Sequence, residues 1–213
     1  MPPLYSKTTL VFMMLLYFAF ACIAAYLLTK NNYPADQTTN WVLVGGLTSE
    51  SVTFRVRKSP SITRLVVSKK YFSDVIYNQT LLDSSTDEQQ LVTSMTVSGL
   101  NSNTQYYYSS RDDNEKIYRE GTFRTAPVEG NRTATRFKFA TAGCAQSGSH
   151  HDIFSVIRDE DPLFFLHLGD IHYEDIHADN VERRINALDR VMNSPTQRDL
   201  FSIPLTYIWD NHD

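Results

Sequence analysis

The segment 137–175, FKFATAGCAQSGSHHDIFSVIRDEDPLFFLHLGDIHYED, constrains the fold of this chain more than any other. It begins with a short apolar run, 137–142. A second, nearly continuous apolar run, 162–168, is typical of a strand buried on both faces of a sheet. A helical pattern lies between the two runs. The order strand, loop, helix, strand, loop predicts a β-α-β unit.

The helix expected between these strands has recognisable boundaries. Ile153, Phe154 and Ile157 recur at helical spacing, and Ser149 is suited to cap the first turn. The pair Asp161–Pro162 is expected to end the helix, because proline does not continue one.

Both strands of a β-α-β unit end at the same edge of the sheet, where open α/β sheets bind their ligands. Cys144 follows the first strand, and Gly169-Asp170-Ile171-His172-Tyr173 follows the second. A thiol, a carboxylate and a phenol are therefore expected to meet, and this set of soft and hard ligands indicates a metal site. A buried structural thiol is the other interpretation of Cys144. A disulfide with Cys22 is not expected, because Cys22 lies in an apolar N-terminal segment.

That segment, 10–28, reads LVFMMLLYFAFACIAAYLL and carries no charge. At ~1.5 Å per residue in a helix it spans about 28 Å, close to the thickness of a hydrocarbon core. We expect residues 1–30 to be a signal anchor, and the polar residues 31–40 to be a stalk. A cleaved signal peptide is the alternative, because Ala19-Phe20-Ala21 resembles a cleavage site. The membrane is thus an expected partner.

Two glycosylation sequons follow the apolar segment, at Asn78-Gln79-Thr80 and Asn131-Arg132-Thr133. Such asparagines are glycosylated only on the exoplasmic side of a membrane. Asn78 and Asn131 therefore favour a single-pass membrane protein with its C-terminal part exoplasmic, or a secreted protein if the N-terminal segment is cleaved.

Residues 41–126 change to a period of two, which predicts an all-β sandwich. Ser51–Arg57 alternates apolar and polar residues along its whole length. Leu100 and Tyr106 are six residues apart, as in the tyrosine corner of fibronectin type III-like modules. We expect a module that folds by itself, with the three tyrosines 106–108 packed in its core or edge rather than forming a binding surface. Residues 127–135 are the expected linker. Further strands are expected at 65–68, 71–76, 91–97, 106–110 and 122–125.

Residues 136–213 form the second expected domain. After the β-α-β unit comes a helix, 181–192, with apolar residues on one face. A short helix at 196–201 and a third apolar strand at 203–209 follow, and the strand leads to Asp210-Asn211-His212-Asp213. The net charge is −4 and no run of Lys or Arg occurs, so a nucleic-acid-binding patch is not expected. The charged residues expected on the solvated face of the longer helix are Glu182, Arg183, Arg184, Asp189 and Arg190.

The residues at these strand ends resemble the signature of the calcineurin-like metallophosphatases. Gly169-Asp170 with Tyr173, followed by Asn211-His212-Asp213, is similar to the pattern Gly-Asp-x-x-Tyr and then Gly-Asn-His-Asp/Glu. Purple acid phosphatases have an Asp after the first core strand, where this chain has Cys144. That Cys, together with Trp209-Asp210 before the third motif, resembles the alkaline phosphatase D (PhoD-like) family.

The resemblance covers roughly residues 41–213. It implies a fibronectin III-like module followed by the N-terminal part of an α/β metallophosphatase domain with a four-layer αββα architecture. It also implies a phosphoesterase that hydrolyses phosphate monoesters or diesters through two metal ions, ferric iron with calcium or another divalent ion.

The same resemblance assigns roles to residues of this chain. Cys144, Asp170 and Tyr173 would bind the first metal, and Asp170 would bridge to a second metal held by Asn211. A metal pair activates a bound water and stabilises charge in an in-line displacement. His212 would lie beside the phosphate, where it would stabilise the transition state or protonate the leaving alcohol. Asp210 and His172 are the candidates for supporting the ligands.

Two features depart from the PhoD-like pattern. Asn211 stands where the family usually has an acidic residue, and Asp210 replaces the glycine before that Asn in the wider metallophosphatase pattern. The later histidine motifs of the family do not follow Asp213, so we expect this chain to be a fragment that is inactive alone. The alternative function is a membrane-tethered binding or adhesion protein with an incomplete, inactive phosphatase core. The sequence indicates neither the substrate nor the oligomeric state.

Overall fold

The structure is a computed structural model that describes residues 40–59, 62–71, 73–81, 92–130, 136–177 and 179–213. The predicted apolar span at 10–28, residues 31–39 of the predicted stalk and Asn131 lie outside these residues. Among the helices of the described part, none is long and apolar enough to cross a membrane.

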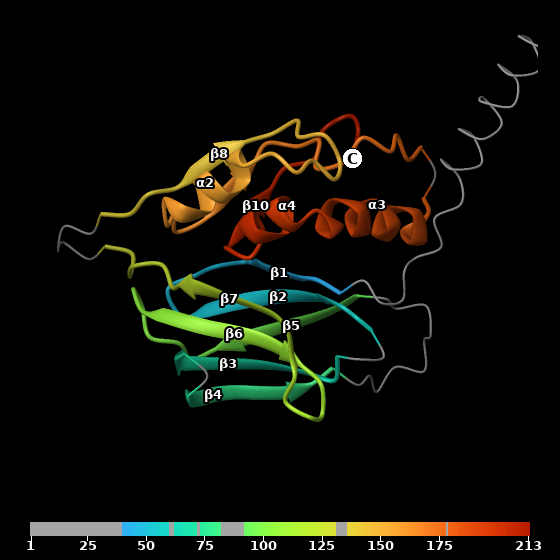
Figure 1. Ribbon diagram of the computed structural model, residues 1–213. Helices are drawn as coiled ribbons and strands as arrows, with labels where there is room; N and C mark the ends of the chain where they lie inside the picture. Colours follow the sequence, from blue (N-terminus) through green and yellow to red (C-terminus); the bar gives the residue numbers. More distant parts are fainter. Residues whose placement is uncertain (1–39, 60–61, 72, 82–91, 131–135, 178) are drawn as a thin grey trace, which may run out of the picture. The chain divides into compact units, whose positions relative to one another are not determined.

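Seven strands between Val42 and Arg124 form two antiparallel sheets (Figure 1). The first sheet has the order β1-β2-β5, and the second has the order β4-β3-β6-β7. The alternating segment 51–57 is β2 throughout, as its period of two predicts. Sequence reasoning missed β1, because four residues are too short to show a period. The strands are β1 (Val42–Gly45), β2 (Ser51–Arg57), β3 (Arg64–Lys70), β4 (Ser73–Thr80), β5 (Val92–Ser98), β6 (Gln105–Arg111) and β7 (Ile117–Arg124).

Alternate residues of the two sheets interdigitate in the sandwich core. Phe54 of β2 packs against Tyr108 of β6 with ring centroids 5.2 Å apart, and Tyr106 stacks on Phe123 at 5.4 Å. The predicted tyrosine corner is formed, since the Asn101 N–H donates to the Tyr106 hydroxyl over 2.8 Å. Tyr106 and Tyr108 are buried, which confirms core packing for these two.

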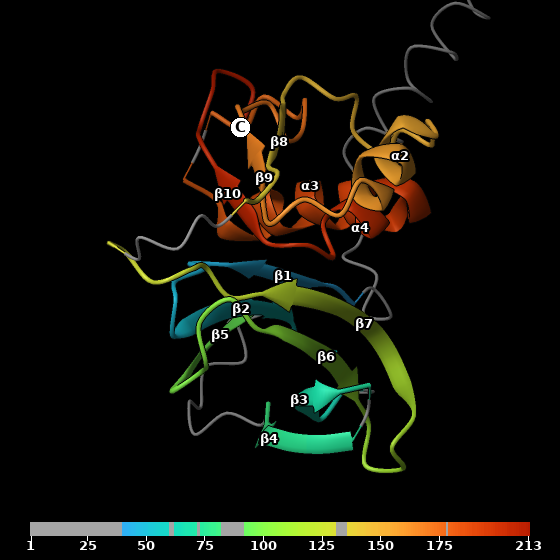
Figure 2. The same cartoon turned by 90° about the vertical axis from the view of Figure 1, so that its left-hand side faces the viewer.

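Residues 136–213 build a three-stranded parallel sheet with three helices (Figure 2). The strand order is β10-β9-β8, so β9 is central. The strands are shorter than their apolar runs, and Phe137 and Phe139 precede β8 as exposed side chains. The elements are β8 (Ala140–Ala142), α2 (Ile153–Asp159), β9 (Phe165–His167), α3 (Val181–Asn193), α4 (Pro195–Leu200) and β10 (Leu205–Tyr207).

The start of α2 differs from the prediction. Its N-cap residue is Asp152, which makes no capping hydrogen bond, and Ser149 lies before the helix. Ile153 is exposed, whereas Phe154 is buried, because a helix of only two turns presents a narrow face to the core. The predicted end of the helix at Asp161–Pro162 is close to the observed end at Asp159. The chain turns at Asp161, which has a left-handed φ of 50°.

The helical layer packs against the outer face of the β1-β2-β5 sheet, and Figures 1 and 2 both show α3 and α4 beside β1. Trp41 belongs to the apolar cluster formed by α3, α4 and β9, not to the sandwich core. Its indole N–H donates to Asp189 over 2.7 Å, and Arg57 of β2 forms an ion pair with the same carboxylate at 3.1 Å. The prediction that Asp189 lies on a solvated face is therefore wrong, because it neutralises a buried arginine.

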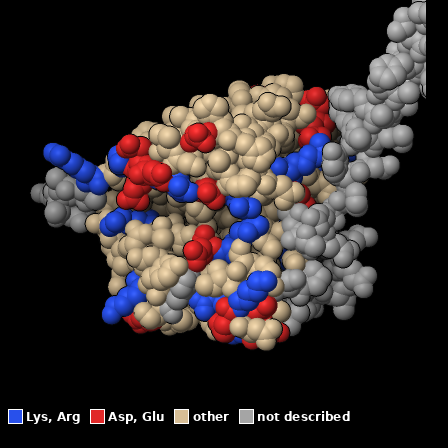
Figure 3. All heavy atoms as spheres, viewed as in Figure 1, with Lys and Arg blue, Asp and Glu red and all other residues tan. Residues whose placement is uncertain are grey.

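On the face drawn in Figure 3, Lys and Arg alternate with Asp and Glu.

Candidate active site

The loops after β8 and β9 meet, as the β-α-β order predicts. Cys144 lies after β8 with a left-handed φ of 59°, and its N–H donates to the Gly169 carbonyl over 3.1 Å. The Cys144 Sγ lies 3.6 Å from Oδ2 of Asp170, which follows β9. Asp170 is buried and also has a left-handed φ, of 53°. Two tight turns thus direct a thiol and a carboxylate toward each other.

The glycine before Asp170 is required by the close approach of the third loop. Gly169 has a φ of 103°, which side chains rarely tolerate. A Cβ at this position would lie 2.4 Å from the Cβ of Asp210. The Gly-Asp sequence therefore lets the loop after β9 lie against the loop after β10.

Asp213 joins these two loops through one carboxylate. It accepts hydrogen bonds from the N–H groups of Asp170 at 2.9 Å, Ile171 at 2.7 Å and Asp210 at 3.0 Å. Burial raises the pKa of Asp213, but a hydrogen bond from Tyr207 and the three backbone donors outweigh burial and lower it overall. The carboxylate therefore stays ionised and holds the turn at Asp170 in place.

Tyr173 lies beside the thiol and the carboxylate. The pKa of Tyr173 is raised to about 12, mainly by desolvation. Hydrogen bonds with Cys144 and Asp170, and the negative charges of these two groups, raise it further. Its backbone N–H donates to the Ser147 hydroxyl over 3.0 Å. Three groups that can carry negative charge are thus held together, and a cation would stabilise them all.

His212 lies over Tyr173, with ring centroids 4.6 Å apart. Its backbone N–H donates to Asp170 Oδ1 over 3.2 Å, and its Nδ1 is 2.6 Å from Asp175 Oδ1. The hydrogen bond with Asp175 is the main reason why the pKa of His212 is raised above its usual 6.5. Sequence reasoning left Asp175 unassigned. Its place in the loop after β9, beside a candidate histidine, was the only available signal.

The other candidates are less closely engaged. Asn211 and Asp210 are exposed, and the Asn211 N–H donates to Asp210 Oδ1 over 2.9 Å. The Asn211 side chain makes no hydrogen bond with any described residue. His172 is buried, which lowers its pKa, and its Nδ1 accepts from the Glu174 N–H. Asn78, the sequon asparagine within the described residues, is exposed on β4.

The donor chemistry around Cys144 suits a metal of intermediate softness. A thiol, a carboxylate and a phenol supply three ligands of different hardness, from two loops that backbone hydrogen bonds hold. Within the described ranges, no group of three or more His, Cys, Asp or Glu side chains is placed to hold a metal ion. Cys144 and Asp170 are two such side chains, and Tyr173 is the third member of the candidate set.

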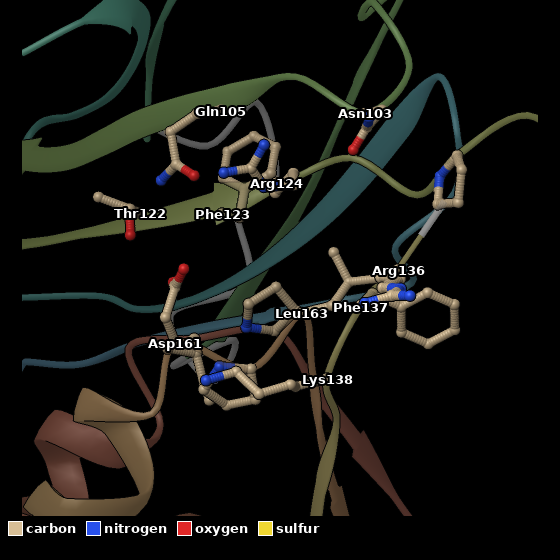
Figure 4. A pocket seen from close by; sticks show the side chains of 14 residues that line it. Asn103, Gln105, Thr122, Phe123, Arg124, Arg136, Phe137, Lys138, Asp161 and Leu163 are labelled. Carbon is tan, nitrogen blue, oxygen red and sulfur yellow. The ribbon is translucent and has the colours of Figure 1, made fainter. Parts of the chain in front are cut away.

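A large hollow of about 940 Å³ lies elsewhere in the molecule (Figure 4). It is lined by the ends of β6 and β7 and by residues that precede β8 and β9, including Arg124, Arg136 and Lys138. None of the candidate ligands lines it. The hollow is therefore not the candidate active site, which lies at the carboxyl edge of the parallel sheet.

Comparison with solved structures identifies the architecture. The structure of PhoD superimposes with a TM-score of 0.68 at 18% identity, covering 84% of this chain and 40% of PhoD. This chain shares the PhoD fold. It spans less than half the length of PhoD. No family model matches the sequence, and no curated protein matches it.

Two other structures each match less than half of this chain. One is an anti-sigma factor sensor domain from Pseudobacteroides cellulosolvens, with a TM-score of 0.34 at 15% identity over 46% of this chain and 97% of that chain. The other is a human fibronectin III domain, with a TM-score of 0.27 at 13% identity over 49% of this chain and 97% of that chain. Their TM-scores are too low to compare folds.

Proposed function

We propose that this protein is a metal-dependent phosphoesterase of the PhoD type, acting on phosphate monoesters or diesters. The observation that carries the proposal is the 3.6 Å approach of Cys144 Sγ to Asp170 Oδ2 at the carboxyl edge of the parallel sheet. The fold shared with PhoD supports it.

The chain supplies the ligands in two groups. Cys144, Asp170 and Tyr173 would hold a first metal, for which ferric iron suits the thiolate and phenolate. Asp170 and Asn211 would hold a second, calcium or another divalent ion. Such a pair, when bound, supplies an acidified water and neutralises charge on the phosphate.

His212 would hold a proton for the leaving alcohol. Its Nδ1 hydrogen bond with Asp175 leaves Nε2 as the free ring nitrogen, and the raised pKa keeps the ring protonated to higher pH. A protonated imidazole is suited to donate to a leaving oxygen or to stabilise the charge of a transferring phosphoryl group.

The test is titration of the full chain with ferric iron, followed by visible absorption. Thiolate and phenolate bound to iron give a charge-transfer band. We expect the band in the unmodified protein, a shifted band in Cys144→Ala and in Tyr173→Phe, each of which keeps one charge-transfer ligand, and its loss when both residues are replaced. Tyr107→Phe, a half-buried tyrosine of β6, is the matched control and should leave the band unchanged.

Activity needs a separate test, because binding of one iron does not show that the two-metal site is complete. Metals of this kind take about four or more ligands each. This chain supplies three for the first metal and two for the second, so we expect the 213-residue chain alone to show no significant turnover with iron, calcium, zinc or manganese. Robust turnover that Asp170→Asn abolishes would contradict this expectation and support a complete site. Absence of the iron band would instead favour the alternative of a binding or adhesion protein.

A further inference from the structure

A second cavity, of about 460 Å³, lies between the outer face of the β1-β2-β5 sheet and the helical layer. An isolated parallel bridge joins Val44 of β1 to Pro204. Beside this bridge, the cavity opens between residues 43–46 and the segment 205–209, which begins with β10. Its volume is within the roughly 300–1,000 Å³ of small-molecule sites.

The walls of this cavity are mostly apolar. Leu43 of β1, Leu188 of α3 and Leu205 of β10 supply aliphatic side chains. Trp209 borders one side of the cavity, and its side chain is 62% exposed. A flat aromatic ligand would bury this indole and the three leucines together.

Two arginines border the same cavity, Arg55 of β2 and Arg184 of α3. Arg57, two residues along the same face of β2, is neutralised by Asp189 at 3.1 Å. In contrast, neither Arg55 nor Arg184 forms a hydrogen bond or ion pair through its side chain with any described residue. The guanidinium of Arg184 lies over the Trp209 ring, 5.2 Å from its centroid. Two guanidinium groups that form no ion pair with a described residue, at an apolar cavity, are complementary to an anion.

We propose that this cavity binds a small organic anion with an aromatic body, the ring lying among the leucines and Trp209 and the acidic group between Arg55 and Arg184. Ile171 and His172, which lie between Asp170 and Tyr173 in the chain, line this cavity, but none of the candidate metal ligands does. The proposal does not depend on phosphoesterase activity, and metal-free protein is sufficient to test it.

The probe is 2-naphthoate, and its neutral control is 2-naphthalenemethanol, which has the same ring system without the charge. Isothermal titration calorimetry with the full chain should give tighter binding of the naphthoate. Arg184→Gln and Arg55→Gln should each weaken it about tenfold, the value of a charge-assisted hydrogen bond. Arg183→Gln removes an exposed charge one residue away and should leave the affinity unchanged.

The position of the probe is read from the two indole N–H signals in nuclear magnetic resonance spectra. The signal that Trp209→Phe removes should shift with naphthoate, whereas the Trp41 signal should stay in place. Equal affinity for the neutral alcohol, equal losses in Arg183→Gln and Arg184→Gln, no shift at Trp209, or no binding at all would each overturn the proposal.

Discussion

At the scale of single residues, Gly169 allows the loops after β9 and β10 to lie close together. Its φ of 103° and the 2.4 Å contact that a Cβ would make with Asp210 act together in Gly169→Ala. We expect a loss of about 1–2 kcal/mol from the backbone and about 1–3 kcal/mol from the overlap. Urea denaturation measures both. Gly99→Ala is the matched control, because Gly99 has a φ of 75° and open space around it, so equal losses would show that the overlap relaxes freely.

His212 is the second residue whose behaviour is set by one contact. Because its folded pKa is raised by Asp175, the pair stabilises the fold below the unfolded pKa of 6.5, and this contribution is lost as the pH rises through the folded value. Asp175→Asn should lower the pKa of His212, as measured by its ring proton shifts during a pH titration. Asp179→Asn, at an exposed acid four residues away, should not change it. An unchanged pKa in Asp175→Asn would mean that the hydrogen bond is absent in solution.

At the scale of elements, α3 is joined to β2 by a buried ion pair. Asp189→Leu removes the carboxylate that pairs with the buried Arg57 and accepts from the Trp41 N–H. We expect a loss of about 3–5 kcal/mol of unfolding free energy. Adding Arg57→Met should restore part of it, because the remaining buried charge is removed.

A matched comparison for this element is the exposed ion pair of Lys138 and Glu160, at 3.2 Å. Glu160→Ala should cost less than about 1 kcal/mol, since exposed pairs contribute little. If Asp189→Leu costs no more than Glu160→Ala, or if Arg57→Met lowers stability further, the contact between α3 and β2 is not an important one in solution.

At the scale of the whole molecule, the described sandwich and the α/β part are expected to unfold together. Trp41 packs with the helices although it directly precedes β1, and the Tyr108 hydroxyl donates to the Ser202 carbonyl over 2.8 Å. Gly121 permits this arrangement, because a Cβ there would overlap Tyr108. Tryptophan fluorescence and far-ultraviolet circular dichroism should therefore give one coincident urea transition. Two separate transitions would show instead that the sandwich folds by itself, as its sequence suggests.

Apart from β1, the sequence by itself determined the order of strands and helices, because the periods of two and 3.6 are local properties of the chain. It also determined that Cys144 and Asp170 meet, since a β-α-β unit brings successive strand ends to one edge. The division into domains and the roles of the candidate ligands stay predictions.

Only the tertiary structure decided which polar residues are paired. Asp189 is 132 residues from Arg57 and 148 from Trp41 in the chain, so the local pattern of α3 assigned it to solvent. Asp175 forms a hydrogen bond with His212, 37 residues away in the chain. Asp213 accepts a hydrogen bond from the backbone N–H of Asp170, 43 residues away. Such pairings depend on how whole elements pack, and a periodic pattern records the burial of a face but not the partner that the face meets.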